Sequence, residues 1–519
     1  MTTLTNPSKR VLFLTNSEYG QAQTQVSIAY ELLSYPDIEV HIASFEELGP
    51  RIPALNKLFN SRHGKAAAGS IGRQGKQIHF HLIDHPSLAK VLQFKNAGAV
   101  SNLSHPPGFW GALRSYPKTV NILLAWEPEE YIAIARRCED LIGEIRPHAV
   151  VVDSLFSAGM DACRRVYGGG GKDVEPGKRK EKPYAILNPL NFCNVLAELQ
   201  PGKAVWWKFP VISSGFPFPL PLHLVALNIL LRLALIFHFV FSLRVLRFAR
   251  HRIRCGYAGL FPAFDPYWAS EMTLSPCIPA LSYPMQIPDN VVACGPITIP
   301  HADNLADEDP ELAKWLRKGK GTILINLGSH AQSSEGNDAV ELATAIRLVL
   351  SSHPSLQILW KFRGAATTHA DRLDNILGPH LRSEQVRIVE WLNVDPAAIL
   401  ASGHVVAMLH HGGANSFFEA AAAGVPQVCL PVWYDTYDFA RHVEFLGVGV
   451  WGNKKVAPHV GAEEVAGAVL RVVGKGDEQE RIRRKARELG EACERAGGRR
   501  KAAETVAEMA MGGRGGTSN

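Results

Sequence analysis

The segment from His411 to Glu419 carries the strongest chemical signal, reading His-Gly-Gly-Ala-Asn-Ser-Phe-Phe-Glu. It follows the apolar run Val405–Leu409 and opens a helical stretch, so its two glycines fall in a predicted strand-to-helix turn, where a ligand can approach backbone amides. Asn415 and Ser416 then lie at a helix N-terminus, whose free N–H groups and positive dipole end favour a diphosphate. His411 can donate a further hydrogen bond to a phosphate, and Glu419 can accept two ribose hydroxyls. The spacing favours a nucleotide site over the alternative of a simple packing turn.

Short apolar runs alternate with helical segments in both halves of the chain, which predicts βαβ units, parallel sheets and an α/β fold. The predicted strands are Arg10–Thr15, Glu39–Ser44, Ala149–Val152, Thr322–Leu327, Gln357–Lys361, Val386–Val389, Val405–Leu409 and Gln427–Pro431. In such sheets ligands lie beyond the carboxyl ends of the strands. The polar segments Asn16–Gln21 and Asp153–Ser154 both follow such ends.

Length and composition favour a packed globular protein of two large domains. The chain has 519 residues, of which 46% are hydrophobic and 20% charged, and its formal net charge is +6. This composition excludes wholesale disorder, and the small net charge argues against a nucleic-acid partner. The eight cysteines are scattered without a CxxC pair, so a compact zinc site is not expected. With no signal-peptide pattern at the N-terminus, we expect reduced thiols and an intracellular, cytoplasmic protein.

A long apolar stretch runs from Leu220 to Phe248, and within it Leu224–Leu243 is long enough in principle to span a bilayer. It holds Asn228, Arg232 and His238 in its interior, and an arginine costs about 3 kcal/mol at a bilayer centre. We therefore expect a helix that rests on a membrane or lies in the core, rather than one that spans. The arginines that follow it suit either an anionic membrane surface or a solvated helix end. Residues 220–254 are accordingly the predicted region of peripheral membrane contact.

The chain resembles the UDP-sugar-dependent glycosyltransferases of family 1, which have the GT-B fold, and in its details their fungal members. The resemblance rests on Trp391, His411–Ser416, Glu419, Gly424–Pro426, Pro431 and Asp435, on Asn326–Ser329 and Asn290–Ile297, and on Tyr434-Asp435 and Gly449–Gly452. It implies two Rossmann-like domains facing across a cleft. The expected boundaries are an N-terminal acceptor-binding domain at 1–295 with an apolar insertion near 200–255, a linker at 296–320, a C-terminal donor-binding domain at 321–475, a closing helix at 476–511 and a disordered tail at 512–519.

The resemblance also implies a role for each matching residue. Trp391 would stack on the uracil, and Glu419 would bind the ribose. Asp435 and Thr436 would face the sugar hydroxyls. The residues expected to hold the diphosphate are Ser329, His411, Gly413, Asn415 and Ser416. No metal ion and no cofactor are implied, because the UDP-sugar is a co-substrate.

Two positions depart from the family pattern. The family has Asp-Gln where this chain has Asp435-Thr436, so the sugar differs from glucose or water fills the space of the longer side chain. The family also has Gly-His in the first N-terminal loop, where the histidine deprotonates the acceptor. Here the pair is Gly20-Gln21, and a glutamine cannot take a proton. The acid that orients that histidine is retained as Asp153.

The loss of the histidine leaves three alternatives open. Asp153 or Glu18 acts as the base directly, provided that burial raises its pKa. Alternatively, the acceptor is a carboxylic acid that is already ionised at neutral pH, or the protein binds the donor without transferring it. The function predicted from the sequence is an inverting transfer from a UDP-sugar to a lipophilic small molecule of sterol, terpenoid or polyketide type. The alternative function is that of a catalytically impaired nucleotide-sugar-binding protein.

Overall fold

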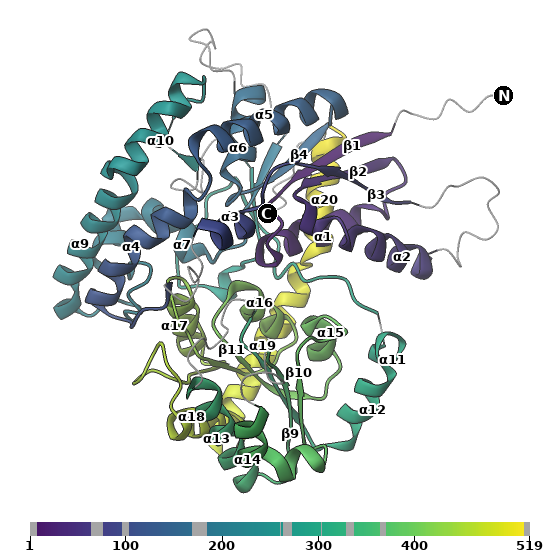
Figure 1. The fold of residues 1–519 in the computed structure, drawn as a ribbon, viewed down its shortest axis with the longest axis vertical. Helices are drawn as coiled ribbons and strands as arrows, with labels where there is room; N and C mark the ends of the chain where they lie inside the picture. Colours follow the sequence, from purple (N-terminus) through teal and green to yellow (C-terminus); the bar gives the residue numbers. More distant parts are fainter. Residues whose placement is uncertain are drawn as a thin grey trace.

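Two parallel β-sheets, each flanked by helices, make up the molecule (Figure 1). The computed structural model describes residues 8–63, 76–95, 103–168, 184–259, 261–262, 272–302, 304–328, 337–363 and 370–512. This architecture confirms the predicted α/β class and the two Rossmann-like domains. Ser329 and the predicted tail from residue 513 onward lie outside the described residues.

The first sheet has seven strands in the order β3-β2-β1-β4-β5-β6-β7. Its strands are β1 (Lys9–Leu14), β2 (Ile38–Ser44), β3 (Ile78–Leu82), β4 (Ala149–Asp153), β5 (Tyr184–Leu187), β6 (Met272–Ser275) and β7 (Val291–Ala293). The helices of this half are α1 (Tyr19–Leu32), α2 (Arg51–His63), α3 (Leu88–Lys95), α4 (Phe109–Leu123), α5 (Pro128–Ile145), α6 (Ser157–Tyr167), α7 (Phe192–Leu196), α8 (Ala204–Trp207), α9 (Leu222–Ile236) and α10 (Leu243–Arg254). Strand β4 is buried along its whole length, as expected of a central parallel strand covered on both faces.

The second sheet has six strands in the order β10-β9-β8-β11-β12-β13. These are β8 (Thr322–Asn326), β9 (Gln357–Lys361), β10 (Val386–Val389), β11 (Val405–His410), β12 (Gln427–Cys429) and β13 (Gly449–Trp451). Its helices are α11 (Leu305–Glu308), α12 (Pro310–Lys318), α13 (Asn337–Ser352), α14 (Ala370–Arg382), α15 (Pro396–Ala401), α16 (Ala414–Ala422), α17 (Thr436–Leu446) and α18 (Ala462–Val473). Residues 296–320, expected as a linker, carry α11 and α12, whose buried side chains pack with those of β8 and β11.

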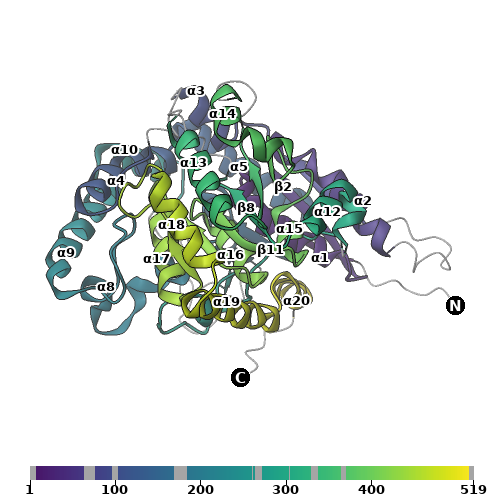
Figure 2. The same cartoon turned by 90° about the horizontal axis from the view of Figure 1, so that it is seen from below.

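The expected single closing helix at 476–511 is two helices, α19 (Asp477–Ala496) and α20 (Arg499–Ala510). Gly497 and Gly498 separate them, both with positive φ angles that glycine adopts without steric cost. Figure 2 shows α19 and α20 following one another along the underside of the molecule. α19 packs on α16 and α18 of the second domain, whereas α20 packs on α1 of the first. The pattern of charged and apolar residues predicts a helix but misses this break, which lets one segment cover both domains.

The apolar stretch forms α9, a π-helical turn at Phe237–Phe241, and α10, at the edge of the first domain (Figures 1 and 2). Leu222–Phe241 is, within the described part of the chain, the one helical segment long and apolar enough to cross a membrane. Only 17% of it is buried. The prediction of a core helix is therefore wrong for most of this segment.

All eight cysteines are free thiols, and six of them are buried. The prediction of unpaired, largely buried cysteines is thus confirmed in the structure.

Candidate functional site

Each sheet reverses its strand order at one point, and the predicted site residues follow the two strands at each reversal. In the first sheet the order reverses between β1 and β4. Gln21 lies in the helix that follows β1, and Asp153 is the last residue of β4. In the second it reverses between β8 and β11, which are followed by Gly328 and His411. Ligands of open α/β sheets bind at such reversals, because the loops diverge there and leave a crevice.

The turn from β11 into α16 has the geometry that its two glycines predict. Gly412 has a φ of +82°, and a Cβ atom there would lie 2.6 Å from the carbonyl oxygen of Thr436. A Cβ atom at Gly413 would lie 2.6 Å from the ring of His411. Only glycine fits at 412, so this backbone packs directly on that of Thr436, whereas a side chain at 413 would displace the His411 ring. His410 is buried under this turn, where its Nδ1 accepts from the Gly412 N–H and so stabilises the turn.

The turn after β8 also packs against the His411 ring. Gly328 has a φ of +82°, and a Cβ atom there would lie 2.7 Å from the His411 ring. The Asn326 side chain accepts a hydrogen bond from the Gly328 N–H at 3.2 Å and so stabilises this turn. The predicted partner residue Ser329 comes next in the chain and lies outside the described residues.

Trp391 lies on the surface after β10 and is 55% exposed, so it is not a core tryptophan. The Lys361 Nζ atom lies 4.9 Å from its ring centroid, and the Arg363 guanidinium carbon lies 4.6 Å away. Burial and the nearby Arg363 lower the pKa of Lys361. A half-exposed indole beside two cations offers a face to a base and positive charge to an attached phosphate.

Asp435 and Thr436 behave differently, although they are adjacent. Burial raises the pKa of the Asp435 carboxyl to about 6. The Thr436 hydroxyl accepts hydrogen bonds from the N–H groups of Val432 and Trp433 and donates to the Trp433 carbonyl. Thr436 is buried and its side chain is used within its own loop, so of this pair the Asp435 carboxylate is the group that remains for a ligand.

A residue of the first domain, Gln23 on α1, joins two residues of the predicted donor site. Its Nε2 donates to Glu419 Oε1 at 2.9 Å, and its Oε1 accepts from Asn415 Nδ2 at 2.8 Å. All three come from helices that face one another across the two domains (Figure 1). Burial raises the pKa of Glu419 to about 8. No sequence motif singles out Gln23, although it lies two residues after Gln21 in the first turns of α1.

The three predicted catalytic residues lie at the ends of neighbouring elements: Asp153 ends β4, Glu18 precedes α1, and Gln21 lies in the first turn of α1. The Asp153 carboxylate accepts from the Leu155 N–H at 2.9 Å and from the Thr15 hydroxyl at 3.4 Å. Burial and the nearby Glu18 raise its pKa to about 7. Glu18 accepts from the Ala89 N–H through Oε1, while its Oε2 is buried with no partner among the described residues.

Gln21 is held by the neighbouring Asn16, whose Nδ2 donates to Gln21 Oε1 at 2.6 Å. No hydrogen bond joins it to Asp153, although both residues are described. The arrangement thus holds a buried pair of carboxyl groups with raised pKa values beside a neutral amide. With a pKa of about 7, Asp153 can take up and release a proton near neutral pH, which the amide cannot do.

Comparison with known proteins accords with this arrangement. Residues 259–484 match the family model of the UDP-glucoronosyl and UDP-glucosyl transferases. Over 97% of its length the chain is 36% identical to glycosyltransferase sdnJ of Sordaria araneosa, of which 98% is covered. Erythritol-mannosyl-transferase 1 of Mycosarcoma maydis is 34% identical over 25% of this chain and 20% of that protein.

Solved structures match over nearly the whole chain. The glycotransferase of kitacinnamycin superposes with a TM-score of 0.61 at 14% identity, covering 97% of this chain and 100% of that one. A UDP-glucosyltransferase from Polygonum tinctorium gives 0.58 at 17% identity, covering 98% and 99%. These matches confirm the expected GT-B fold.

Proposed function

The chain belongs to the UDP-glycosyltransferase family, and we propose that it transfers a hexose from a UDP-sugar to a lipophilic small molecule with inversion at the anomeric carbon. The observation that carries the proposal is the contact of Gln23 with Asn415 and Glu419, because it brings the first turns of α1, which also hold Gln21, against the predicted donor helix. An acceptor bound beside Gln21 would therefore lie close to a donor bound at Asn415 and Glu419.

The reaction is a single displacement. An acceptor oxygen attacks the anomeric carbon, the bond from that carbon to the diphosphate oxygen breaks, and the acceptor proton passes to a base. The N-terminus of α16 and His411 would stabilise the charge that develops on the departing UDP. Trp391 would stack on the uracil, Glu419 would hold the ribose, and Ser416 would add a donor in the first turn of α16.

We assign the base to the carboxyl pair Asp153 and Glu18. A carboxyl group of ordinary pKa is a poor base at neutral pH, but burial raises the pKa of Asp153 to about 7. Glu18 has a raised pKa too, and its Oε2, which has no partner in the described part of the chain, leaves one oxygen for an acceptor proton. An acceptor that is itself a carboxylic acid needs no base, and this remains the alternative for the proton step.

A lipophilic acceptor is supported by an apolar cluster that reaches the predicted sugar site. Tyr434, which precedes Asp435, packs against buried residues of α4 and α9 and of the segment between α8 and α9. The buried members of this cluster are Ala112, Tyr116, Val211, Phe216, Leu220 and Leu231. An acceptor of sterol, terpenoid or polyketide type would suit such surroundings, and its glycosylation would belong to secondary metabolism.

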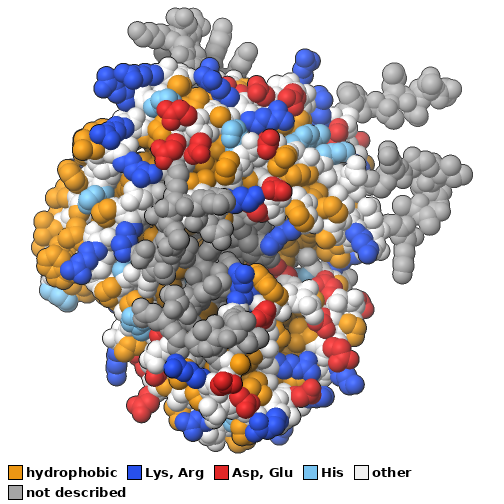
Figure 3. Space-filling model, in the orientation of Figure 1, with side chains coloured by type: hydrophobic (Ala, Val, Ile, Leu, Met, Phe, Trp, Pro, Cys, Tyr) orange, Lys and Arg blue, Asp and Glu red, His pale blue; other side chains and the backbone are white. Residues whose placement is uncertain are grey.

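Peripheral membrane contact is part of the proposal. In Figure 3 hydrophobic side chains gather along the left edge, where Figure 1 places α9, and Lys and Arg side chains lie near the upper end, where it places α10. Leu222, Leu233 and Phe237 are each more than half exposed. A cytoplasmic location at a membrane surface agrees with this face and with the free thiols.

The polar side chains of α9 explain why the helix would lie on a bilayer and not cross it. Asn228 accepts from the Val211 N–H, and Arg232 donates to the carbonyl of Phe209. These bonds attach one face of α9 to its own domain, which leaves the opposite, apolar face for lipid.

The test is transfer by the purified full-length protein, with a panel of UDP- and GDP-sugars and apolar acceptors that carry hydroxyl or carboxyl groups. We expect a UDP-sugar to be consumed and a product of inverted configuration to form. Binding of UDP-sugars without transfer or hydrolysis, with turnover restored by Gln21→His, would instead indicate a donor-binding protein that has lost catalysis. Transfer confined to carboxylic acceptors would replace the assigned base by the alternative.

A further inference from the structure

His105 belongs to the first domain, yet it contacts the loop between β12 and α17 of the second. Its backbone N–H donates to the Val432 carbonyl at 3.1 Å, and its carbonyl accepts from the Tyr437 hydroxyl. Its ring Nε2 accepts from the Tyr434 N–H at 3.0 Å. The residue is 5% exposed. Three bonds from one residue thus hold the stretch of chain on either side of Asp435.

Two contacts fix the same tautomer of the His105 ring. Nδ1 lies 2.8 Å from the carbonyl oxygen of Pro106, which can only accept, so Nδ1 carries the proton. Nε2 faces a backbone N–H, which can only donate, so Nε2 carries the lone pair. Burial lowers the pKa of His105 and favours this neutral form. The Ser213 hydroxyl, 2.9 Å from Nε2, is the other neighbour of that nitrogen.

The contacted loop has a backbone that needs support. Tyr434 has a φ of +25°, a conformation that costs a non-glycine residue free energy and persists where surrounding contacts impose it. The Thr436 hydroxyl supports the loop from within, and His105 supports it from the other domain. Asp435 lies between these two supports.

We propose that His105 is a positioning residue for the donor sugar, which holds the Tyr434 backbone and thereby places the Asp435 carboxylate in the sugar site. The inference rests on the proposed function, since it takes Asp435 as the group that meets the sugar hydroxyls. It assigns part of the donor-sugar site to the acceptor-binding domain, so the sugar is held fully only when the two domains meet as they do here.

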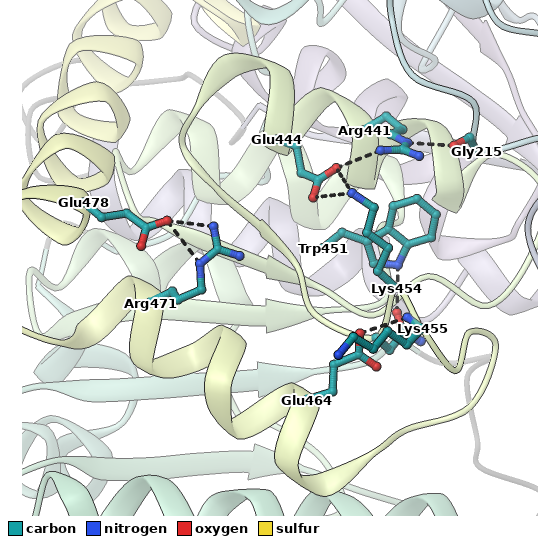
Figure 4. A network of polar contacts seen from close by, with 10 residues as sticks. Gly215, Arg441, Glu444, Trp451, Lys454, Lys455, Glu464, Arg471 and Glu478 are labelled. Carbon is teal, nitrogen blue, oxygen red and sulfur yellow. Dashed lines mark hydrogen bonds and ion pairs between the residues drawn. The ribbon is translucent and has the colours of Figure 1, made fainter. Parts of the chain in front are cut away.

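Helix α17 has a second attachment to the first domain, which provides a control. Arg441 Nε donates to the carbonyl of Gly215 at 2.7 Å, and Glu444 binds both Arg441 and Lys454 (Figure 4). This bond also joins the two domains, but Arg441 lies in the middle of α17, six positions after Asp435. Arg441→Ala therefore weakens domain contact without releasing the Tyr434 backbone.

The experiment compares the affinity for UDP with that for the UDP-sugar that the wild-type enzyme uses, both by calorimetry. The sugar should make UDP-sugar bind more tightly than UDP, and we expect His105→Ala to reduce this gain by about 10- to 100-fold while UDP binds as before. This is the effect of losing the hydrogen bond between a sugar hydroxyl and the charged Asp435 carboxylate. The KM for the donor should rise with it. His105→Gln, whose amide oxygen reaches the position of Nε2, should behave as wild type. His105→Asn, whose oxygen falls at the position of Nδ1, should behave as alanine.

Each other outcome overturns the proposal. Equal losses for UDP and UDP-sugar would indicate general disruption, and equal effects of Arg441→Ala and His105→Ala would indicate domain contact alone. Unchanged binding in His105→Asn would show that the nitrogen does not position the loop. If His105→Ala does not fold, the comparison of His105→Gln with His105→Asn tests the proposal, since the two variants carry the same amide group at different distances from the backbone. A wild-type protein that binds UDP but transfers no sugar would refute the proposed function, and the affinity comparison would then be made with UDP-glucose.

Discussion

Gln23 of the first domain and Glu419 of the second are joined by a hydrogen bond of 2.9 Å, although they are 396 positions apart in the chain. The same Gln23 side chain accepts from Asn415, so one amide orients two residues of the predicted donor site. A carboxyl group has room for further hydrogen bonds beside the one from Gln23, which leaves Glu419 able to bind ribose hydroxyls. Helix α1 of the first domain is thereby joined directly to α16 of the second.

The pH dependence of turnover should report the buried carboxyl pair. Because a base must be deprotonated and Asp153 has a pKa of about 7, kcat/KM should fall as the pH drops below about 7. Asp153→Asn keeps an oxygen for the Leu155 N–H but cannot take a proton, so kcat should fall by about 10²- to 10⁴-fold. Steady-state kinetics of Asp153→Asn and Glu18→Gln, with a hydroxyl acceptor, identify which of the two is the base. Full activity in both variants would contradict the assignment.

Trp391→Ala should weaken UDP binding without unfolding the protein. Stacking of a base on an aromatic side chain contributes about 1–3 kcal/mol, so the Kd for UDP should rise by roughly 5- to 150-fold. The thermal midpoint should change little, because the indole is half exposed. Trp207→Ala removes another half-exposed tryptophan far from the donor loops and is the matched control. A similar change in Kd in both variants would refute stacking at Trp391.

The raised pKa of Glu419 should make the stability of the ligand-free protein depend on pH. Burial raises its pKa from the ordinary 4.5 to about 8, so between these values the folded state binds more protons than the unfolded state. The stability linked to Glu419 is therefore complete below about pH 4.5 and is lost as the pH rises through about 8. Glu419→Gln removes this dependence, so the variant should gain stability relative to wild type from pH 5 to pH 9. Denaturant unfolding across that range tests it, and parallel curves for the two proteins would contradict it.

The apolar face of α9 predicts binding to lipid. Replacement of Leu233, Phe237 and Phe241 together by serine removes exposed apolar side chains without touching Asn228 or Arg232. Co-sedimentation with anionic phospholipid vesicles should fall about tenfold or more, given roughly 1.5–3 kcal/mol per buried side chain of this size. Val456→Ser, an exposed apolar residue of the second domain, is the control. Absence of vesicle binding by the wild-type protein would eliminate the membrane contact.

A buried ion pair should dominate the stability of the region around α10. Arg252 Nε and Asp161 Oδ2 lie 2.7 Å apart, both side chains are buried, and the Tyr131 hydroxyl donates to the same carboxylate. Asp161→Ala leaves the arginine charge buried and unpaired, which should cost about 3–5 kcal/mol in the free energy of unfolding. Arg471 and Glu478 form a similar but solvent-exposed pair (Figure 4), and Glu478→Ala should cost about 1 kcal/mol or less. Equal losses in the two variants would contradict this difference.

Local patterns in the sequence predicted eight of the thirteen strands that the structure describes, and each lies within a few residues of its predicted place. The tight turn at Gly412 and Gly413 was also predicted from the sequence, because a turn that admits a ligand must lack side chains. Strands β3, β5, β6, β7 and β13 were missed. They are three to five residues long, and such short runs carry too little periodicity to separate them from loops.

Only the tertiary structure decided how the site is completed. Long-range contacts give Gln23 and His105 their roles, because their partners lie more than 300 positions away in the chain. The Thr436 hydroxyl is bonded within its own loop. Neither kind of contact produces a residue spacing that can be recognised in the sequence. The face that α9 presents was decided in the same way, since Asn228 and Arg232 could have faced lipid, solvent or protein until their partners at 206–211 were in place. Sequence determines which residues can do chemistry, whereas long-range packing determines which of them meet.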